Sequence, residues 1–145
     1  MVDDVILRKA EIRDADVIYN FICRLEGENP TQTEFDQVFR RNLTDPDTYY
    51  YLAEKNSEAL GFISLQIRNI LHHTSPIGEI VEMFVLPEYR DQGIGELLYW
   101  NMRDIAQEKG CKFFEVACNI VRNRALDFFK GLGLQQTHYK FTERL

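Results

Sequence analysis

An apolar strand that leads through a glycine-containing turn into a helix is the feature that most constrains how this chain can fold. The apolar run that starts at Val81 ends at Pro87, and the loop Arg90-x-x-Gly93-x-Gly95 then opens a helix. Glycines let backbone N–H groups approach a ligand closely, and the N-terminus of a helix attracts negative charge. The stretch therefore predicts a strand, an anion-binding loop and a helix, with phosphate or pyrophosphate as the ligand.

Two other phosphate-binding motifs do not fit this spacing. A P-loop needs Lys-Ser or Lys-Thr after its last glycine, where this chain has Glu96 and Leu97. A dinucleotide fingerprint needs a third small residue, where this chain has Leu98. The loop instead resembles the acyl-coenzyme A loop of the GNAT superfamily of N-acetyltransferases, Arg/Gln-x-x-Gly-x-Gly/Ala. A plain helix start after a tight turn is the alternative explanation.

The resemblance implies an α/β fold of the α+β type, with a mixed, mostly antiparallel sheet of six to seven strands and helices on both faces. It also implies that a central pair of parallel strands splays apart around acetyl-CoA, the expected cosubstrate. The residues that the resemblance and the loop place at this cofactor are Phe84, Val85, Arg90, Asp91, Gln92, Gly93, Ile94, Gly95, Glu96, Asn119, Asn123, Ala125, Phe128 and Phe129.

Length and charge narrow the class of protein further. At 145 residues with 45% hydrophobic content, the chain is expected to be one acetyltransferase domain spanning residues 1–145. A net charge of -6 disfavours nucleic acid and anionic membranes as partners. The N-terminus is acidic and the longest apolar run is too short to span a bilayer, so we expect a cytoplasmic protein.

The cysteines indicate no structural cross-link. Cys23, Cys111 and Cys118 are odd in number and lack C-x-x-C spacing, so they are expected to be reduced, mostly buried thiols. The sequence does not decide the oligomeric state, and a homodimer is compatible with it.

Hydrophobic spacing and punctuation residues predict the remaining elements. A long helix should join the central strand, which starts at Ile77, to the next strand, so these two strands should be parallel in a right-handed crossover. In chain order we expect a strand at 5–7, a helix from Asp14 or Asp16 to Gly27, a helix from Thr31 to Pro46, a hairpin of 49–53 and 60–67, a helix from Ile94 to Gly110, a strand at 112–118, a helix at 124–130 and a terminal strand at 136–142.

Acetyl transfer from a thioester to an amine needs a hydrogen-bond donor for the carbonyl oxygen and a base for the ammonium proton. The resemblance implies a strand bulge that frees a backbone N–H near Val85 to be the donor. Glu79 and Glu82 are the candidate bases, and a bulge between them would bring both to one face. We favour Glu79, because Glu82 lies nearer the expected bulge and could pair locally. A solvated carboxylate at the margin of the sheet is the alternative for either residue.

One position departs from the family pattern. Where related chains often carry a tyrosine that protonates the leaving thiolate, this chain has Phe129, which has no proton to give. The proton must then come from water, Tyr89 or Tyr139, or the thiolate must leave without a proton donor because its own basicity is modest. Asn119, expected to bind pantetheine, has a helix cap as its alternative role.

Several scattered segments look more specifically like aminoalkylphosphonate N-acetyltransferases. They are Leu71-His72-His73, 77–80, 42–46 and 141–145. This resemblance implies a small primary amine with an anionic head as the acceptor. It also makes His72 and His73 candidates for binding a divalent metal at that head, although adjacent side chains diverge in extended structure and solvent-facing histidines are the simpler expectation.

Two other functions stay open at this point. A non-catalytic acyl-CoA binding or regulatory module would keep the loop and lose turnover, and Phe129 is the sequence feature that favours it. A protein or peptide N-acetyltransferase is the other alternative.

Overall fold

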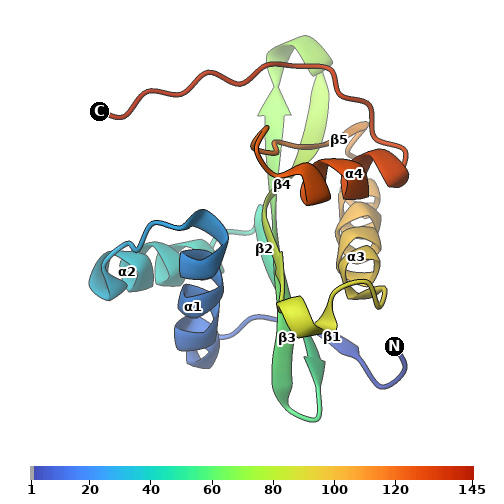
Figure 1. Cartoon of the computed structure of the whole chain (residues 1–145). Coiled ribbons are helices and arrows are strands. Elements are labelled where there is room, and N and C mark those ends of the chain that lie inside the picture. The colour runs from blue at the N-terminus through green and yellow to red at the C-terminus, as the bar shows by residue number, and fades with distance from the viewer. Residues whose placement is uncertain (1) are drawn as a thin grey trace.

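The chain forms one mixed sheet of five strands in the order β1-β2-β3-β4-β5, in a computed structural model that describes residues 2–145 (Figure 1). All neighbouring strands are antiparallel except β4 and β5. The strands are β1 (Ile6–Lys9), β2 (Thr48–Lys55), β3 (Glu58–Ile70), β4 (Ser75–Val85) and β5 (Phe113–Val116). The helices are α1 (Ala15–Glu26), α2 (Gln32–Leu43), α3 (Ile94–Glu108) and α4 (Asn123–Gly131), with short 3-10 turns η1 (Ile12–Asp14), η2 (Leu71–His73) and η3 (Pro87–Tyr89).

The expected fold class is confirmed, but the expected count of six to seven strands is wrong for the described residues. The segment 136–142, predicted as a terminal strand, is extended and exposed without strand pairing. Its alternation of polar and aromatic residues is a real strand preference, but a strand forms only where a neighbouring strand accepts its hydrogen bonds.

Two apolar cores lie on opposite faces of the sheet. Figure 1 shows α1 and α2 on one side of the sheet and α3 on the other. Successive residues of a strand point to opposite faces, so Phe62 belongs to the core under α1 and α2 while Ile63 belongs to the core under α3. On the α3 side, Leu98 and Met102 are completely buried. β3 and β4 lie between these two cores, and this packing fixes the central strands that carry the candidate site.

The helix boundaries follow the residues that predicted them. Gly27 ends α1 in the left-handed conformation, with φ of 70°. Thr31 caps α2, and its hydroxyl oxygen accepts a hydrogen bond from the Glu34 N–H. Asp14 precedes α1 without making a side-chain cap bond. It instead accepts two hydrogen bonds from Arg8, at 2.7 and 2.8 Å, so the Asp14 carboxylate ties the start of α1 to β1.

The β4–α3–β5 unit has the predicted parallel connection. Four consecutive pairs join the two strands, from Ile77 with Phe113 to Ile80 with Val116, and among the described residues none follows Ile80. β4 continues to Val85 while β5 ends, so the two strands part after Ile80. No helix in residues 2–145 is long and apolar enough to cross a bilayer.

Gly61 generates a prediction for stability, because a side chain added to this residue of β3 would press against the backbone of β4. An added Cβ would lie 2.9 Å from the backbone carbonyl oxygen of Phe84, which cannot rotate away. Gly61→Ala should therefore lower the free energy of unfolding by about 1–3 kcal/mol, measured by urea denaturation.

Gly131→Ala is the matched control. Nothing lies within 4 Å of its added Cβ, and the residue ends α4, where alanine favours the helix. Its unfolding free energy should stay level or rise slightly. Equal losses for both variants would contradict the crowding at Gly61.

Candidate active site

β4 carries a bulge at Val81 and Glu82, as the family resemblance implied for the strand leading to the loop. Ile63 of β3 pairs with Met83, but Leu65 pairs with Ile80. Ser64, the single residue between these two β3 positions, therefore faces two residues of β4, Val81 and Glu82. A bulge of this kind interrupts the ladder and turns the inserted residues away from their regular directions.

The bulge brings Glu79 and Glu82 to the same face of the sheet. Glu79 is the partner of Gln66 on β3, and Glu82 is hydrogen-bonded to Ser64. Ser64 and Gln66 are two residues apart on one strand, so their side chains share a face. Without the extra residue, two carboxylates three positions apart would point to opposite faces.

Glu82 is held by Ser64 through both its backbone and its side chain. The buried Ser64 hydroxyl accepts a hydrogen bond from the Glu82 N–H at 2.9 Å and donates a short one to the Glu82 carboxylate. Burial raises the pKa of the Glu82 carboxyl, the hydrogen bond from Ser64 lowers it, and the charges of Glu26 and Glu79 raise it. The net direction is upward, towards the range in which a carboxylate can take up a proton from an amine.

Glu79 is in a different environment. Its carboxylate accepts a hydrogen bond from Arg68 at 2.9 Å, and the same guanidinium lies 3.8 Å from Glu115 on β5. Glu26, whose charge acts on Glu82, lies 3.6 Å from Arg122 in the loop before α4. Each carboxylate that raises the Glu82 pKa is thus itself paired with an arginine.

The backbone of Val85 points towards the gap between β4 and β5. The Leu86 N–H donates to the Leu60 carbonyl of β3 at 2.9 Å. Because strand residues direct their backbone groups alternately to the two sides, the Val85 N–H and C=O face away from β3. Arg90 confirms this direction, since its Nε donates to the Val85 carbonyl at 2.8 Å.

The loop and the start of α3 have the backbone that an anion site needs. Asp91 and Gly93 have φ of 60° and 88°, and Ile94 begins α3 directly afterwards. The first N–H groups of a helix have no acceptor within the helix and can therefore bind an anion. Gln92 donates to the Glu88 carbonyl at 3.1 Å.

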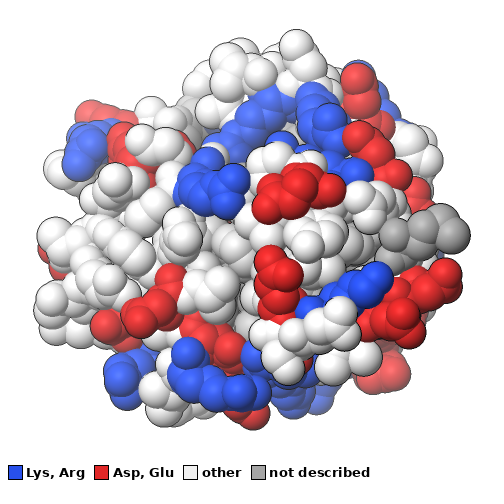
Figure 2. Space-filling view, turned by 60° about the horizontal axis from the view of Figure 1, so that its bottom comes forward, with Lys and Arg blue, Asp and Glu red and all other residues white. Residues whose placement is uncertain are grey.

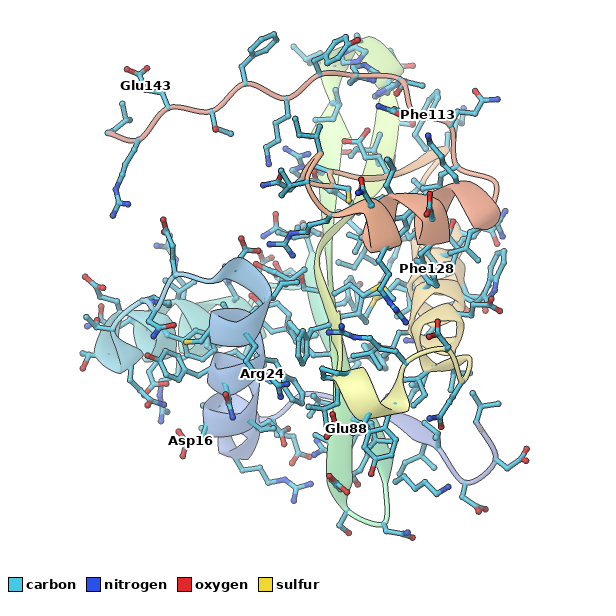
Figure 3. The ribbon with its side chains drawn as sticks, in the orientation of Figure 1. Asp16, Arg24, Glu88, Phe113, Phe128 and Glu143 are labelled. Carbon is cyan, nitrogen blue, oxygen red and sulfur yellow. The ribbon has the colours of Figure 1, made fainter. Side chains whose placement is uncertain are left out.

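α4 packs over this loop. Arg124 donates to Asp91 at 2.6 Å, and an added Cβ on Gly95 would lie 3.3 Å from the ring of Phe128. In Figure 3, Phe128 projects from α4 towards the space between α4 and the start of α3. The structure therefore brings Gly95 beside Phe128, while Glu96 lies in the first turn of α3 and Asn123 and Ala125 lie on α4.

Three arginines gather beside the loop in a protein of negative net charge. The guanidinium carbons of Arg24 and Arg90 lie 5.3 and 5.5 Å from the centre of the Phe84 ring. Burial lowers the pKa of Arg90, and the charges of Arg124 and Arg24 lower it further. Figure 3 shows Arg24 on the side of α1 that faces the sheet, and Figure 2 shows basic side chains gathered in a band on one face. This local positive charge suits an anionic ligand.

On the other side of the gap, Asn119 makes a local turn. Its Oδ1 accepts from the Val121 N–H at 3.1 Å and its carbonyl accepts from the Arg122 N–H at 2.9 Å. Of the possible proton donors to the thiolate, Tyr89 is half-buried against both cores, while Tyr139 is 88% exposed on the C-terminal segment.

His72 and His73 lie in the turn between β3 and β4. The centre of the His73 ring lies 4.1 Å from that of Phe113 and 4.2 Å from that of His72, with the ring planes tilted by 35° and 42°. Within residues 2–145, no three His, Cys, Asp or Glu side chains are grouped so that they could hold one metal ion. The described side chains thus give no support to the metal part of the expectation.

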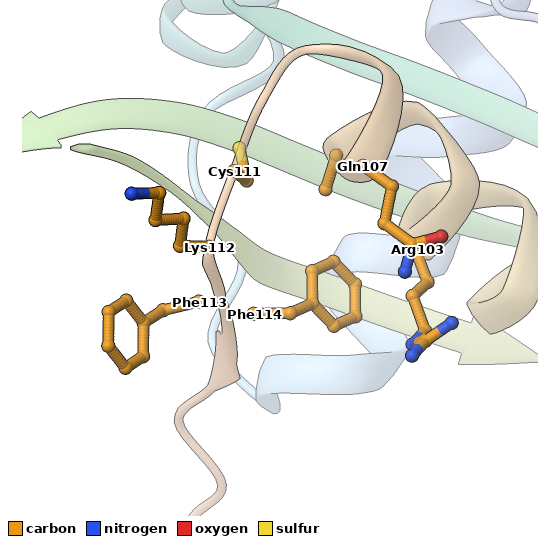
Figure 4. A pocket seen from close by; sticks show the side chains of 7 residues that line it. Arg103, Gln107, Cys111, Lys112, Phe113 and Phe114 are labelled. Carbon is orange, nitrogen blue, oxygen red and sulfur yellow. The ribbon is translucent and has the colours of Figure 1, made fainter.

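Two pockets of the structure include no residue of the β4 bulge, the loop or α4. One, of about 110 Å³, lies between α3 and β5 and includes Arg103 and Phe114 (Figure 4). The other, of about 470 Å³, lies between β2 and the end of α3 and includes Tyr49 and Tyr51. The candidate site is instead the open junction of β4, the loop and α4.

Sequence reasoning missed Ser64, Arg24 and Arg124. Ser64 could have been found, because it is the one polar side chain in the apolar run 62–65. The two arginines had no such signal, since only the packing of α1 and α4 brings them to the loop.

A family model and a sequence relative show the family, and solved structures show the same fold. The model of the acetyltransferase (GNAT) family matches residues 15–134. An aminoalkylphosphonate N-acetyltransferase of Salmonella typhimurium is 40% identical over 140 residues, covering 96% of this chain and 90% of that protein. Among solved structures, an aminoglycoside N-acetyltransferase in complex with CoA has a TM-score of 0.87 at 18% identity, over 97% of this chain and 94% of that one. A transcriptional regulator from Bacillus halodurans has a TM-score of 0.88 at 21% identity, over 97% and 99%.

The two glycines of the loop generate a prediction for coenzyme A binding. Gly93 has φ of 88°, which a β-branched residue adopts only under strain, so Gly93→Val should displace the loop backbone. We expect the dissociation constant for coenzyme A, measured by calorimetry, to rise about tenfold or more, equivalent to about 1.4 kcal/mol.

Gly95→Ala serves as the control. Its Cβ would meet the flexible tip of Met83 at 3.0 Å, which can move aside, so affinity should be largely kept. Unchanged affinity of Gly93→Val, with an unchanged melting temperature, would contradict the anion-loop interpretation.

Proposed function

Because the chain belongs to the GNAT acetyltransferase family and is an acyl-CoA-dependent N-acetyltransferase, we propose that it acetylates the primary amine of a small aminoalkylphosphonate by direct attack on acetyl-CoA. The observation that carries the mechanism is the bulge, which aligns Glu79 and Glu82 beside the gap between β4 and β5. The acceptor named for the Salmonella relative supports the substrate class.

The binding residues have distinct roles in this proposal. The N–H groups at Gly93 to Glu96 bind the pyrophosphate, and Arg90 adds charge there while holding the Val85 carbonyl. The β4–β5 gap takes the pantetheine arm, with Asn119, Asn123 and the α4 residues on its far side. Acetyl-CoA supplies the reactive thioester, which would lie against Phe84 and Val85.

The Val85 N–H is the proposed donor to the carbonyl oxygen of the acetyl group. It faces the gap and is fixed there by the neighbouring Leu86 bond to β3, so it costs no reorganisation as charge develops. Phe129 packs against the core and gives no proton. The thiolate is a weak enough base to leave without a dedicated acid.

We propose Glu82 as the base, acting directly or through one water, with Glu79 as the alternative that the sequence favoured. Glu79 is occupied by Arg68, whereas Glu82 is held by a neutral hydroxyl and has a raised pKa. A base with a pKa nearer to neutrality accepts a proton from an ammonium group more readily.

An anionic head requires positive charge near the amine site. Arg68 and Arg122 pair with the two carboxylates that act on Glu82, and Arg24 lies over Phe84. A phosphonate could accept charge-assisted hydrogen bonds from these guanidinium groups.

The free thiols of all three cysteines and the dependence on acyl-CoA support the proposed cytoplasmic location.

The base assignment predicts a pH dependence. Activity should rise with pH as Glu82 loses its proton, and Glu82→Gln should lower kcat by about 10²-fold and remove this acid limb, with coenzyme A affinity kept. Ser64→Ala removes the hydrogen bond that lowers the Glu82 pKa, so the acid limb should move to higher pH. A full loss of the limb in Glu79→Gln, with Glu82→Gln active, would reverse the assignment.

The acceptor class is tested by steady-state kinetics with matched amines. Aminoethylphosphonate should have a higher kcat/KM than ethylamine, because charge-assisted contacts to its head orient the amine. Arg68→Gln and Arg122→Gln should raise KM for the phosphonate more than KM for acetyl-CoA. Adding a chelator, or replacing His72 and His73 by alanine, reports separately whether a divalent metal bridges the head. Equal use of neutral amines, polyamines or peptides would overturn the acceptor class and leave the acetyltransferase activity standing.

A further inference from the structure

The last residue of α1 carries a charge that its own helix disfavours. Glu26 ends α1, and Gly27 follows it in the left-handed conformation. The C-terminal end of a helix holds partial negative charge, so an acidic side chain there destabilises the helix. The Glu26 carboxylate is 53% exposed and lies 3.6 Å from the guanidinium of Arg122, in the loop before α4. The position of Glu26 is therefore explained by this arginine and not by the helix that carries it.

Arg122 holds Glu26 loosely, although the backbone of Arg122 is fixed. The Arg122 N–H donates to the Asn119 carbonyl at 2.9 Å. The ion pair itself, at 3.6 Å, is longer than a hydrogen bond, and ion pairs this exposed contribute little to stability. Arg68, by contrast, donates to Glu79 at 2.9 Å. Of these two arginines, Arg122 thus has the partner that is more easily replaced.

Glu26 acts on the proposed base as well as on Arg122. Burial raises the pKa of the Glu82 carboxyl, the hydrogen bond from Ser64 lowers it, and the charges of Glu26 and Glu79 raise it. A charge acts on a carboxyl in this way only from nearby, because water and salt screen it at longer range. The Glu26–Arg122 pair therefore borders the position proposed for the acceptor amine.

We propose that Glu26 is a resident anion, which the anionic head of the acceptor displaces from Arg122 when it binds. The displacement rests on the proposed function, since it needs an acceptor with an anionic head. In the free enzyme the Glu26 carboxylate neutralises Arg122. In the complex the phosphonate oxygens take its place and accept charge-assisted hydrogen bonds from the guanidinium. A neutral amine leaves the pair of Glu26 and Arg122 intact.

A resident anion lowers the affinity for the head that displaces it. Part of the interaction free energy between the head and Arg122 offsets the separation of Arg122 from Glu26, so only the remainder appears as binding. Removing the Glu26 carboxylate should therefore strengthen the binding of a phosphonate, whereas general damage to the site would weaken it. Glu26 in this way sets the affinity for the acceptor without donating a hydrogen bond to it.

The first test is calorimetry of aminoethylphosphonate binding to the enzyme saturated with coenzyme A. Glu26→Gln keeps the shape of the side chain and removes its charge, so the dissociation constant should fall about two- to fivefold. The dissociation constant for ethylamine should stay level or rise, because an ammonium group gains nothing from the loss of a carboxylate. The melting temperature should not fall. Unchanged or weaker binding of the phosphonate by Glu26→Gln would overturn the displacement.

Glu28→Gln is the matched control. Glu28 is two residues further along the same segment, lies 3.7 Å from Arg144, and loses the same charge when it is replaced. Its phosphonate affinity should stay close to that of the parent chain. An equal gain in Glu28→Gln would assign the effect to net charge and overturn the role of Glu26.

The second test is a double-mutant cycle with Arg122→Gln, which separates displacement from simple repulsion between Glu26 and the head. If the head displaces Glu26 from Arg122, the gain from Glu26→Gln should disappear when Arg122 is also replaced. An equal gain in both backgrounds would assign the effect to repulsion and overturn the displacement. A parent chain that binds aminoethylphosphonate no better than ethylamine would overturn the acceptor class, and the displacement with it. A parent chain that prefers the phosphonate, with no gain in Glu26→Gln, would overturn the displacement alone.

Discussion

The unequal pairing of β3 and β4 is the constraint on which the rest of the site depends. One residue of β3 faces two of β4, so β4 changes the faces of its side chains partway along its length. The first half of β4 still pairs with β5, and the second half leaves it. A gap inside a sheet would normally expose unpaired backbone at a high cost, and it persists here because both faces of β3 and β4 are packed by apolar cores.

Positive charge gathers around Arg90 although the net charge of the molecule is negative. The chain carries -6 overall, yet the pKa of Arg90 is lowered by burial and further by the positive charges of Arg124 and Arg24. Repulsion of this kind disfavours the free protein and is relieved when an anion binds among the three groups. Loop, α1 and α4 are separate in the chain, so an anion here would also hold three elements together.

The sequence predicted the local elements well and the long-range arrangement less well. The glycines at 93 and 95, the cap at Thr31 and the apolar spacing of α3 each act within a few residues, and the helices predicted from them are confirmed. The bulge was expected from resemblance, but the contrast between Glu79 and Glu82 depends on Arg68 and Ser64, which come from another strand. The terminal strand predicted at 136–142 was wrong, because an alternating pattern indicates a preference for strand but does not show which neighbouring strand would accept its hydrogen bonds.

The two-way bond between Ser64 and Glu82 has a consequence for the moment after a proton arrives. A hydroxyl has one hydrogen and two lone pairs, so Ser64 can keep accepting from the Glu82 N–H while its own hydrogen turns away and it accepts from the newly protonated carboxyl. The anchor of the bulge is thus the same oxygen in both charge states. In the proposed mechanism, proton uptake and release by Glu82 need only the rotation of one hydroxyl, and the strand can remain still between successive turnovers.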